Sequence, residues 1–296
     1  MSETARLHDG AAIEIQIAGS GPTVLLPVNP VPAEGERADE LRRWGMDPAL
    51  GRTLLTGLAD LATVVAFDYE GHVLANPKPD TLTPDNIVAD IEAIADAAGA
   101  TKFTYYGYSW LGLVGIQLAI RSPRLSAVCV AGFAPLDGPY REMLAVTEAT
   151  HRLELKAASS PPPEPWKTAI ADDGEIDWST VPVTLTPDQT AQFVTLYRAL
   201  EAFDDRAAQS QIACPRLCLV GGADRIDYDE RWGGVRVDMA GLVERNRTEL
   251  ERLGWDVRVL DGLDHTGAMQ PPAVLPVLRP WLARVLAAEP EQAPAR

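Results

Sequence analysis

Between residues 23 and 133, short apolar segments alternate with amphipathic ones along the chain. The apolar runs predict buried strands at 23–28, 64–67, 102–106 and 125–133. Segments between them carry apolar residues three and four positions apart, which predicts helices. Continuous apolar strands joined by helices are typical of a parallel sheet covered on both faces. The sequence therefore predicts an α/β fold with a mostly parallel central sheet.

The alternation stops at residue 134 and resumes after residue 213. The interval contains a triple proline and a capping-box pattern that opens a helix at Thr186. Strands at 216–220 and 257–260, each followed by a helix, complete the alternating pattern. We therefore predict a core domain formed by residues 1–133 and 214–296, with a helical cap inserted at 134–213.

The strand expected at 102–106 gives way to a helix within three residues, through Gly107, Ser109 and Gly112. Such a sharp turn places the serine in a strained conformation, with its hydroxyl clear of the backbone and close to a helix N-terminus. The geometry suits a nucleophile. A serine before a helix is more often a simple N-cap, so the motif needs support from the rest of the chain.

A serine hydroxyl needs a base within hydrogen-bond reach. The chain has four histidines: His8, His72, His151 and His265. His72 and His265 both follow predicted strands, at the sheet edge where Ser109 is expected. His265 lies on a loop that leaves the ring free to reach the serine, whereas His72 has an alternative role in pinning its own loop.

A catalytic histidine needs a carboxylate that fixes its tautomer. Asp224 directly follows the strand at 216–220, although a turn or cap aspartate is an equal alternative at such a position. Three other aspartates are also candidates: Asp137, Asp227 and Asp229. Ser109, Asp224 and His265 each follow a different predicted strand, in the chain order typical of α/β-hydrolases.

The chain resembles an α/β-hydrolase-fold protein over roughly residues 6–288. The matching segments are the N-terminal hairpin, 67–72, 107–112, 221–224 and Asp264-His265. The resemblance implies that Ser109 is the nucleophile, His265 the base and Asp224 the acid. It also implies that residues 134–213 form the cap and that no metal or organic cofactor takes part.

The sequence departs from the family's pattern in two places. The family usually has a small residue two places after the nucleophile, where this chain has Leu111. It often has His-Gly where this chain has Pro27-Val28-Asn29-Pro30. The oxyanion hole is then expected to use the N–H of Trp110 and that of Val28 or Asn29, because proline has no N–H.

The pattern favours a serine hydrolase that cleaves a hydrophobic carboxylic ester or lactone. Aromatic residues beside the nucleophile and in the cap are the candidates for substrate binding: Tyr108, Trp166, Trp178, Phe193 and Tyr197. Two alternatives stay open. One is different chemistry on the same fold, such as C–C bond hydrolysis, perhydrolysis or a lyase or cyclase reaction. The other is a non-catalytic protein that binds a small molecule.

The chain has 42 acidic and 26 basic residues, and its net charge of −16 disfavours nucleic-acid binding. We expect no membrane span or signal peptide, because no long apolar run or N-terminal apolar segment is present. Three cysteines, none in a metal-binding spacing, favour a reducing, cytoplasmic setting. The expected partner is a small-molecule substrate, and a homo-oligomer stays open.

Overall fold

The computed structural model describes residues 2–158 and 184–288. Its centre is an eight-stranded sheet in the order β1-β2-β4-β3-β5-β6-β7-β10. β1 and β2 are antiparallel to their neighbours, and all other pairs are parallel. The strands are β1 (Ser2–Arg6), β2 (Ala12–Ala18), β3 (Thr23–Leu26), β4 (Thr63–Ala66), β5 (Phe103–Tyr108), β6 (Leu125–Ala131), β7 (Arg216–Gly221) and β10 (Trp255–Leu260). The predicted fold class is confirmed.

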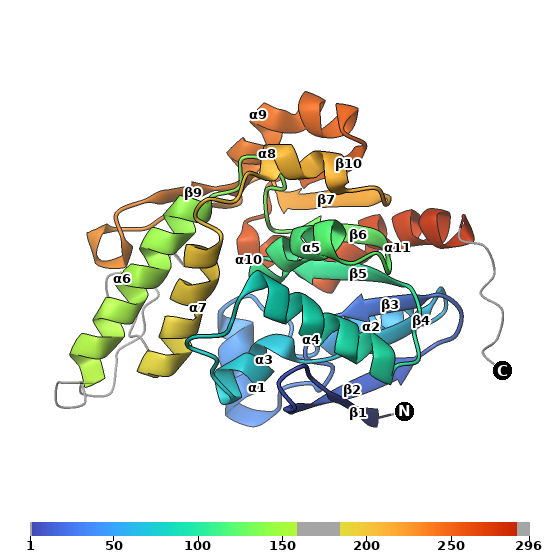
Figure 1. The fold of residues 1–296 in the computed structure, drawn as a ribbon, viewed down its shortest axis with the longest axis horizontal. Helices are drawn as coiled ribbons and strands as arrows, with labels where there is room; N and C mark the ends of the chain where they lie inside the picture. The colour runs from blue at the N-terminus through green and yellow to red at the C-terminus, as the bar shows by residue number, and fades with distance from the viewer. Residues whose placement is uncertain (1, 159–183, 289–296) are drawn as a thin grey trace.

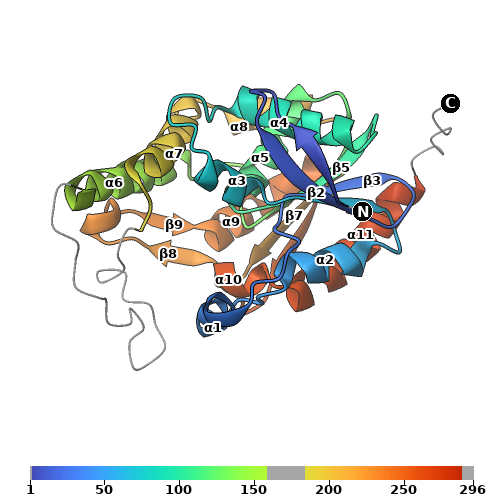
Figure 2. The ribbon, with the colours of Figure 1, turned by 90° about the horizontal axis from the view of Figure 1, so that it is seen from below.

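Helices cover both faces of this sheet (Figure 2). They are α1 (Gly35–Arg43), α2 (Leu50–Leu58), α3 (Tyr69–Ala75), α4 (Pro84–Ala97), α5 (Trp110–Arg121), α6 (Tyr140–Ala158), α7 (Pro187–Ala199), α8 (Asp205–Ala208), α9 (Met239–Arg252), α10 (His265–Ala268) and α11 (Pro271–Ala287). Side chains alternate along each strand, so Leu25 and Val65 pack under α4, α5 and α9. Val24 and Val64 pack on the other face, against α2 and α11.

Helices α6 and α7 pack against each other beyond the carboxyl ends of the strands (Figure 1). Three side chains of α7 tie it to the last turn of α3 and to the segment that follows α3. Gln189 donates to the Leu74 carbonyl at 2.6 Å, Gln192 to the Val73 carbonyl at 3.0 Å, and Thr195 to the Pro79 carbonyl. These helices lie within the predicted cap, but the division into core and cap domains stays a prediction.

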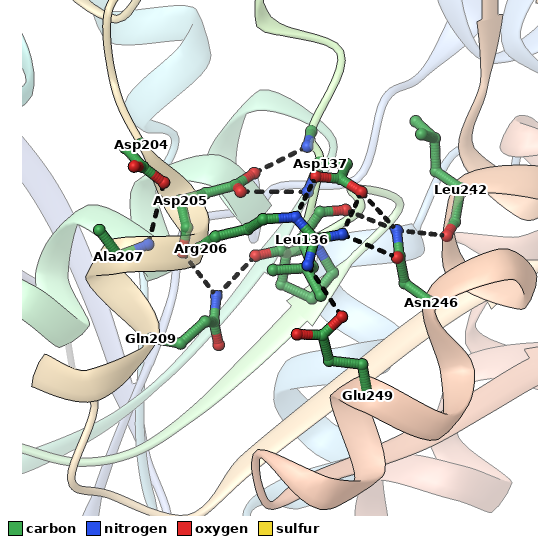
Figure 3. A network of polar contacts seen from close by, with 12 residues as sticks. Leu136, Asp137, Asp204, Asp205, Arg206, Ala207, Gln209, Leu242, Asn246 and Glu249 are labelled. Atoms are coloured by element: carbon green, nitrogen blue, oxygen red, sulfur yellow. Dashed lines mark hydrogen bonds and ion pairs between the residues drawn. The ribbon is translucent and has the colours of Figure 1, made fainter.

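The two connections between this helical pair and the sheet meet in one polar network (Figure 3). The buried Asp205 carboxylate accepts the N–H groups of Asp137 and Gly138, at 3.1 and 2.8 Å. Burial raises the pKa of Asp205 despite these two bonds. The neighbouring Arg206 binds Asp137 through two nitrogens and Glu249 of α9 through one. The chain segments that enter α6 and leave α7 are thereby joined to each other and to α9.

Several elements are not predicted by the sequence patterns. Residues 2–6 form β1, although they are polar, because an edge strand exposes most of its side chains. Helices α1 and α3 follow β3 and β4. A hairpin of β8 (Arg225–Asp227) and β9 (Arg236–Asp238) lies between β7 and α9. In the part of the chain that the structure describes, no helix is long and apolar enough to cross a membrane.

Candidate active site

The turn between β5 and α5 holds Ser109 in a strained backbone conformation. Its φ is 59° and its ψ is −128°, values that non-glycine residues rarely adopt. Its N–H donates to the Ala131 carbonyl at 2.8 Å, which fixes the turn against β6. A Cβ on Gly107 would come within 2.0 Å of the Leu111 carbonyl oxygen, so the turn needs glycine there. The sequence thus forms the sharp strand-to-helix turn that it predicts.

Leu111 fits this turn because its side chain is buried in the core beneath α5. The Tyr105 hydroxyl, fully buried, donates to the Leu111 carbonyl at 3.0 Å. The close approach to β6 falls instead at Gly112, where a Cβ would lie 2.6 Å from the Ala131 oxygen. The missing small residue at position 111 therefore leaves the turn intact.

His265 and Asp224 are hydrogen-bonded to each other. The Nδ1 atom of His265 lies 2.8 Å from a carboxylate oxygen of Asp224, whose side chain is 1% exposed. A carboxylate accepts only, so Nδ1 carries the proton and Nε2 of a neutral ring is left as an acceptor. The other candidate aspartates are engaged elsewhere: Asp137 and Asp227 pair with arginines, and Asp229 caps a short 3-10 helix.

Tyr108 connects this histidine to the serine turn. Its hydroxyl donates to the His265 carbonyl at 2.6 Å, and the two rings lie 5.1 Å apart. Because Tyr108 precedes Ser109, the contact places the imidazole beside the serine turn. Burial, and then the charges of Asp224 and Asp264, raise the pKa of Tyr108, so its hydroxyl stays a donor. Among the residues that the structure describes, Ser109 makes no side-chain hydrogen bond to His265, and such bonds often tighten only when substrate binds.

The loop after β3 lies at the same sheet edge and contains one backbone N–H that is unbonded among the described residues. The Val28 N–H donates to the Leu26 carbonyl at 2.8 Å, whereas the Asn29 N–H has no acceptor within the described ranges 2–158 and 184–288. The Trp110 N–H, in the first turn of α5, is likewise unused there. Gly51 of α2 packs against this loop so closely that a Cβ would lie 1.9 Å from the Asn29 carbonyl oxygen.

The predicted substrate-binding residues are only partly brought together. Phe193 packs edge-on against Trp110, with ring centroids 5.5 Å apart, so it lies near the serine turn. Tyr197, one turn later on α7, is buried in the core of the helical pair and 3% exposed. Tyr108 contacts His265 as described above. Trp166 and Trp178 lie outside the described residues.

The other histidines are placed in structural surroundings. His8 binds the buried Asp90 carboxylate through Nδ1 at 2.6 Å, and His151 lies 2.8 Å from the Thr190 hydroxyl. His72 is buried, and its Nε2 has no hydrogen-bond partner in the described part of the chain. Burial, and then the nearby Lys78, lower the pKa of His72 and favour its neutral form. The alternative role of His72 as a ring that pins its loop through Nε2 is therefore not observed.

A buried ion pair lies behind the site. Lys78 of the loop after α3 binds Asp90 at 2.9 Å and Asp9 at 2.8 Å, and Asp90 also accepts the Tyr69 hydroxyl at 2.8 Å. The Tyr69 ring lies 6.1 Å from that of Trp110. Within the described residues, no group of three or more His, Cys, Asp or Glu side chains is placed to hold a metal ion.

No known protein family and no curated protein matches the sequence. Solved structures do match, over nearly the full length of both chains. An esterase from Thermogutta terrifontis is 18% identical, covers 96% of this chain and 99% of its own, and has a TM-score of 0.54. An enol-lactonase from Burkholderia xenovorans is 15% identical, with 95% and 99% covered and a TM-score of 0.53.

A third structure is a meta-cleavage product hydrolase from Pseudomonas fluorescens, with 14% identity, 95% and 97% coverage and a TM-score of 0.56. Identities this low show the fold alone. The resemblance in fold noted from the sequence is thereby confirmed.

Proposed function

We propose that this chain, which has the α/β-hydrolase fold, is a serine hydrolase that cleaves a carboxylic ester or lactone. The observation that carries the proposal is the 2.8 Å His265–Asp224 pair beside the strained turn at Ser109. A strained serine next to a histidine whose tautomer is fixed by a buried carboxylate is the arrangement that nucleophilic catalysis requires.

In the proposed mechanism, His265 Nε2 accepts the proton of the Ser109 hydroxyl while its oxygen attacks the substrate carbonyl carbon. Asp224 stabilises the imidazolium that forms. The backbone N–H groups of Trp110 and Asn29 hold the developing oxyanion; Val28 is the weaker of the two loop candidates, because its N–H is already bonded. The imidazolium then protonates the leaving alcohol, and an acyl-enzyme results.

Water completes the cycle. His265 removes a proton from a water molecule, which attacks the acyl carbon and releases the acid and the free Ser109. The aromatic wall formed by Trp110 and Phe193 favours a hydrophobic acyl or alkyl group. An esterase and an enol-lactonase among proteins of the same fold support this substrate class.

The second candidate is C–C bond hydrolysis by the same residues. It is favoured by the altered loop at Pro27-Val28-Asn29-Pro30 and by the similarity in fold to a meta-cleavage product hydrolase. A protein that is inert toward simple activated esters but cleaves vinylogous diketones would favour this candidate.

The test uses a fluorophosphonate probe, which labels only activated serines, together with hydrolysis of p-nitrophenyl esters. We expect the probe to modify Ser109, identified by peptide mass spectrometry. Ser109→Ala should lose both labelling and hydrolysis, by a factor on the order of 10⁶ in kcat. The matched control is Ser20→Ala, at an exposed turn remote from this sheet edge. Persisting hydrolysis in Ser109→Ala would refute the proposal.

A further inference from the structure

The last strand at one end of the sheet, β10, has a neighbouring strand on one side only. It pairs with β7, and the Leu260 carbonyl accepts the N–H of Gly222, just after β7, at 2.7 Å. The backbone groups of successive strand residues point to opposite sides, so Leu260 and every second residue before it face β7. The residues of β10 whose N–H and C=O groups face away from the sheet are Trp255, Val257 and Val259.

These outward-facing backbone groups are unpaired. In the described ranges of the chain, none of them has a hydrogen-bond partner. Beside them, on the face of the sheet that α11 covers, lies a groove of about 220 Å³. β10 lines this groove with Asp256 and Arg258, and α11 contributes Trp281 and Arg284 among its lining residues. A row of unpaired N–H and C=O groups along a sheet edge is a template for another strand.

The charged side chains of β10 match a second copy of the same strand. Asp256 and Arg258 are two residues apart and therefore lie on one face of the strand. An antiparallel copy must set outward-facing residues against outward-facing residues, and the registers that keep most of the strand paired are centred on position 256, 257 or 258. Centring on 257 puts Asp256 opposite Arg258 of the second copy, on both sides of the axis. Centring on 256 or 258 puts two aspartates or two arginines directly opposite each other, which is destabilising.

The register centred on 257 also brings the opposite charges close together. The backbone groups of Asp256 and Arg258 face β7, so across the new contact these residues form non-hydrogen-bonded pairs, whose Cα atoms lie about 4.5 Å apart. Within one chain, the Asp256 carboxylate is bound by Nε of Arg258 at 2.8 Å and by Arg284 of α11 at 2.8 Å. A guanidinium has five N–H donors, and the Arg258 side chain is 52% exposed, so its terminal nitrogens can bind a second carboxylate.

We propose that two copies of this chain associate through β10, antiparallel and centred on Val257, so that their two sheets continue as one across a twofold axis. Val257 then pairs with Val257 of the second copy, and Trp255 with Val259, each pair exchanging two backbone hydrogen bonds. A twofold contact needs a surface that complements itself, and Asp256 and Arg258 give this strand that property. The association does not depend on the proposed hydrolase function.

The first test measures the mass and the amide exchange of the wild-type protein. At about 100 µM, light scattering after size exclusion should give twice the 31.9 kDa of one chain. Amide hydrogen exchange in the peptide that spans β10 should be slower in the dimer than in the chain dissociated by dilution or by the substitutions below. Exchange in β1, the edge strand at the other end of the sheet, should be the same in both. A monomer at this concentration, or a dimer that leaves β10 unprotected, overturns the proposal.

The second test reverses the charges that set the register. Asp256→Arg gives β10 two positive charges and Arg258→Asp gives it two negative charges, so each variant opposes like charges across the axis. The Kd of each variant's own dimer should rise at least tenfold. An equimolar mixture of the two variants should form a mixed dimer, detected by native mass spectrometry, because every cross-strand contact then joins opposite charges.

The matched control is Glu14→Arg, which makes the same change of charge at an exposed position on β2 and should leave the dimer intact. Thermal unfolding reports whether each variant is folded, and if one is not, the exchange measurement on the wild-type protein decides. Folded variants that dimerise as tightly as the wild type, or whose mixture forms no mixed dimer, overturn the proposal.

Discussion

Replacing Gly51 by alanine tests whether the loop after β3 supplies an oxyanion donor. The new methyl group would lie 1.9 Å from the Asn29 carbonyl oxygen and 2.6 Å from its carbon. Ordinary contact begins at 3.4 Å, so the Asn29 carbonyl must retreat by about 1.5 Å, and we expect the Asn29 N–H, on the other side of the same Cα, to move with it. An oxyanion donor works at 2.7–3.1 Å, and a displacement of that size breaks its hydrogen bond.

Loss of one such donor lowers kcat by about 10²–10³. The oxyanion forms only in the transition state, so kcat should fall while KM stays nearly constant. The assay is steady-state hydrolysis of a p-nitrophenyl ester, with thermal unfolding measured in parallel to show that the variant is folded.

Gly57→Ala is the matched control, because it makes the same change in the same helix. Its nearest neighbour is the Leu275 side chain, at 2.8 Å, which can rotate away. We expect its kcat to stay within about threefold of the wild-type value. A folded Gly51→Ala protein with wild-type kcat would refute the assignment of Asn29 as an oxyanion donor.

Two further predictions concern side chains behind the site. Tyr108→Phe keeps the ring contact with His265 but removes a 2.6 Å hydrogen bond, so the free energy of unfolding should fall by about 0.5–1.5 kcal/mol in urea titration; an unchanged midpoint would contradict this. Lys78→Met leaves the Asp90 carboxylate buried without its cation and should cost about 3–5 kcal/mol in the same assay. Burial opposes ionisation of both Lys78 and Asp9, but their hydrogen bonds win, so the pKa of Lys78 is raised and that of Asp9 lowered. The stability that the pair contributes should therefore be lost below about pH 4 as Asp9 is protonated and above about pH 10 as Lys78 is deprotonated, and Lys78→Met should flatten both limbs of the pH–stability curve.

The fold, and the placement of Ser109, Asp224 and His265 at one edge of the sheet, could be predicted because both depend on periodicity. Ser109, Asp224 and His265 each follow an apolar run, and a parallel sheet carries all such positions to one edge. Periodicity does not distinguish Asp224 from the other three candidate aspartates. It depends on hydrogen bonds of Asp137, Asp227 and Asp229 to groups distant in sequence or within a short turn.

The pocket lining could be predicted only in part. Phe193 and Tyr197 share one face of α7 at a spacing of four, and the sequence cannot distinguish them. In the structure one contacts Trp110 and the other is buried. Strands β8 and β9 have three residues each, too few for a periodic signal.

The junction at Asp205 and Arg206 has a consequence for how such proteins diversify. Two chain segments connect the sheet with the α6–α7 pair, and they are cross-linked to each other. Asp205, after α7, binds the backbone of the segment before α6, and Arg206 binds α9. An insert whose two connecting segments lie side by side can be lengthened, shortened or exchanged for another without altering the register of any strand. Under the proposed function, substrate range can thus change in the exchanged segment while Ser109, Asp224 and His265 keep their places.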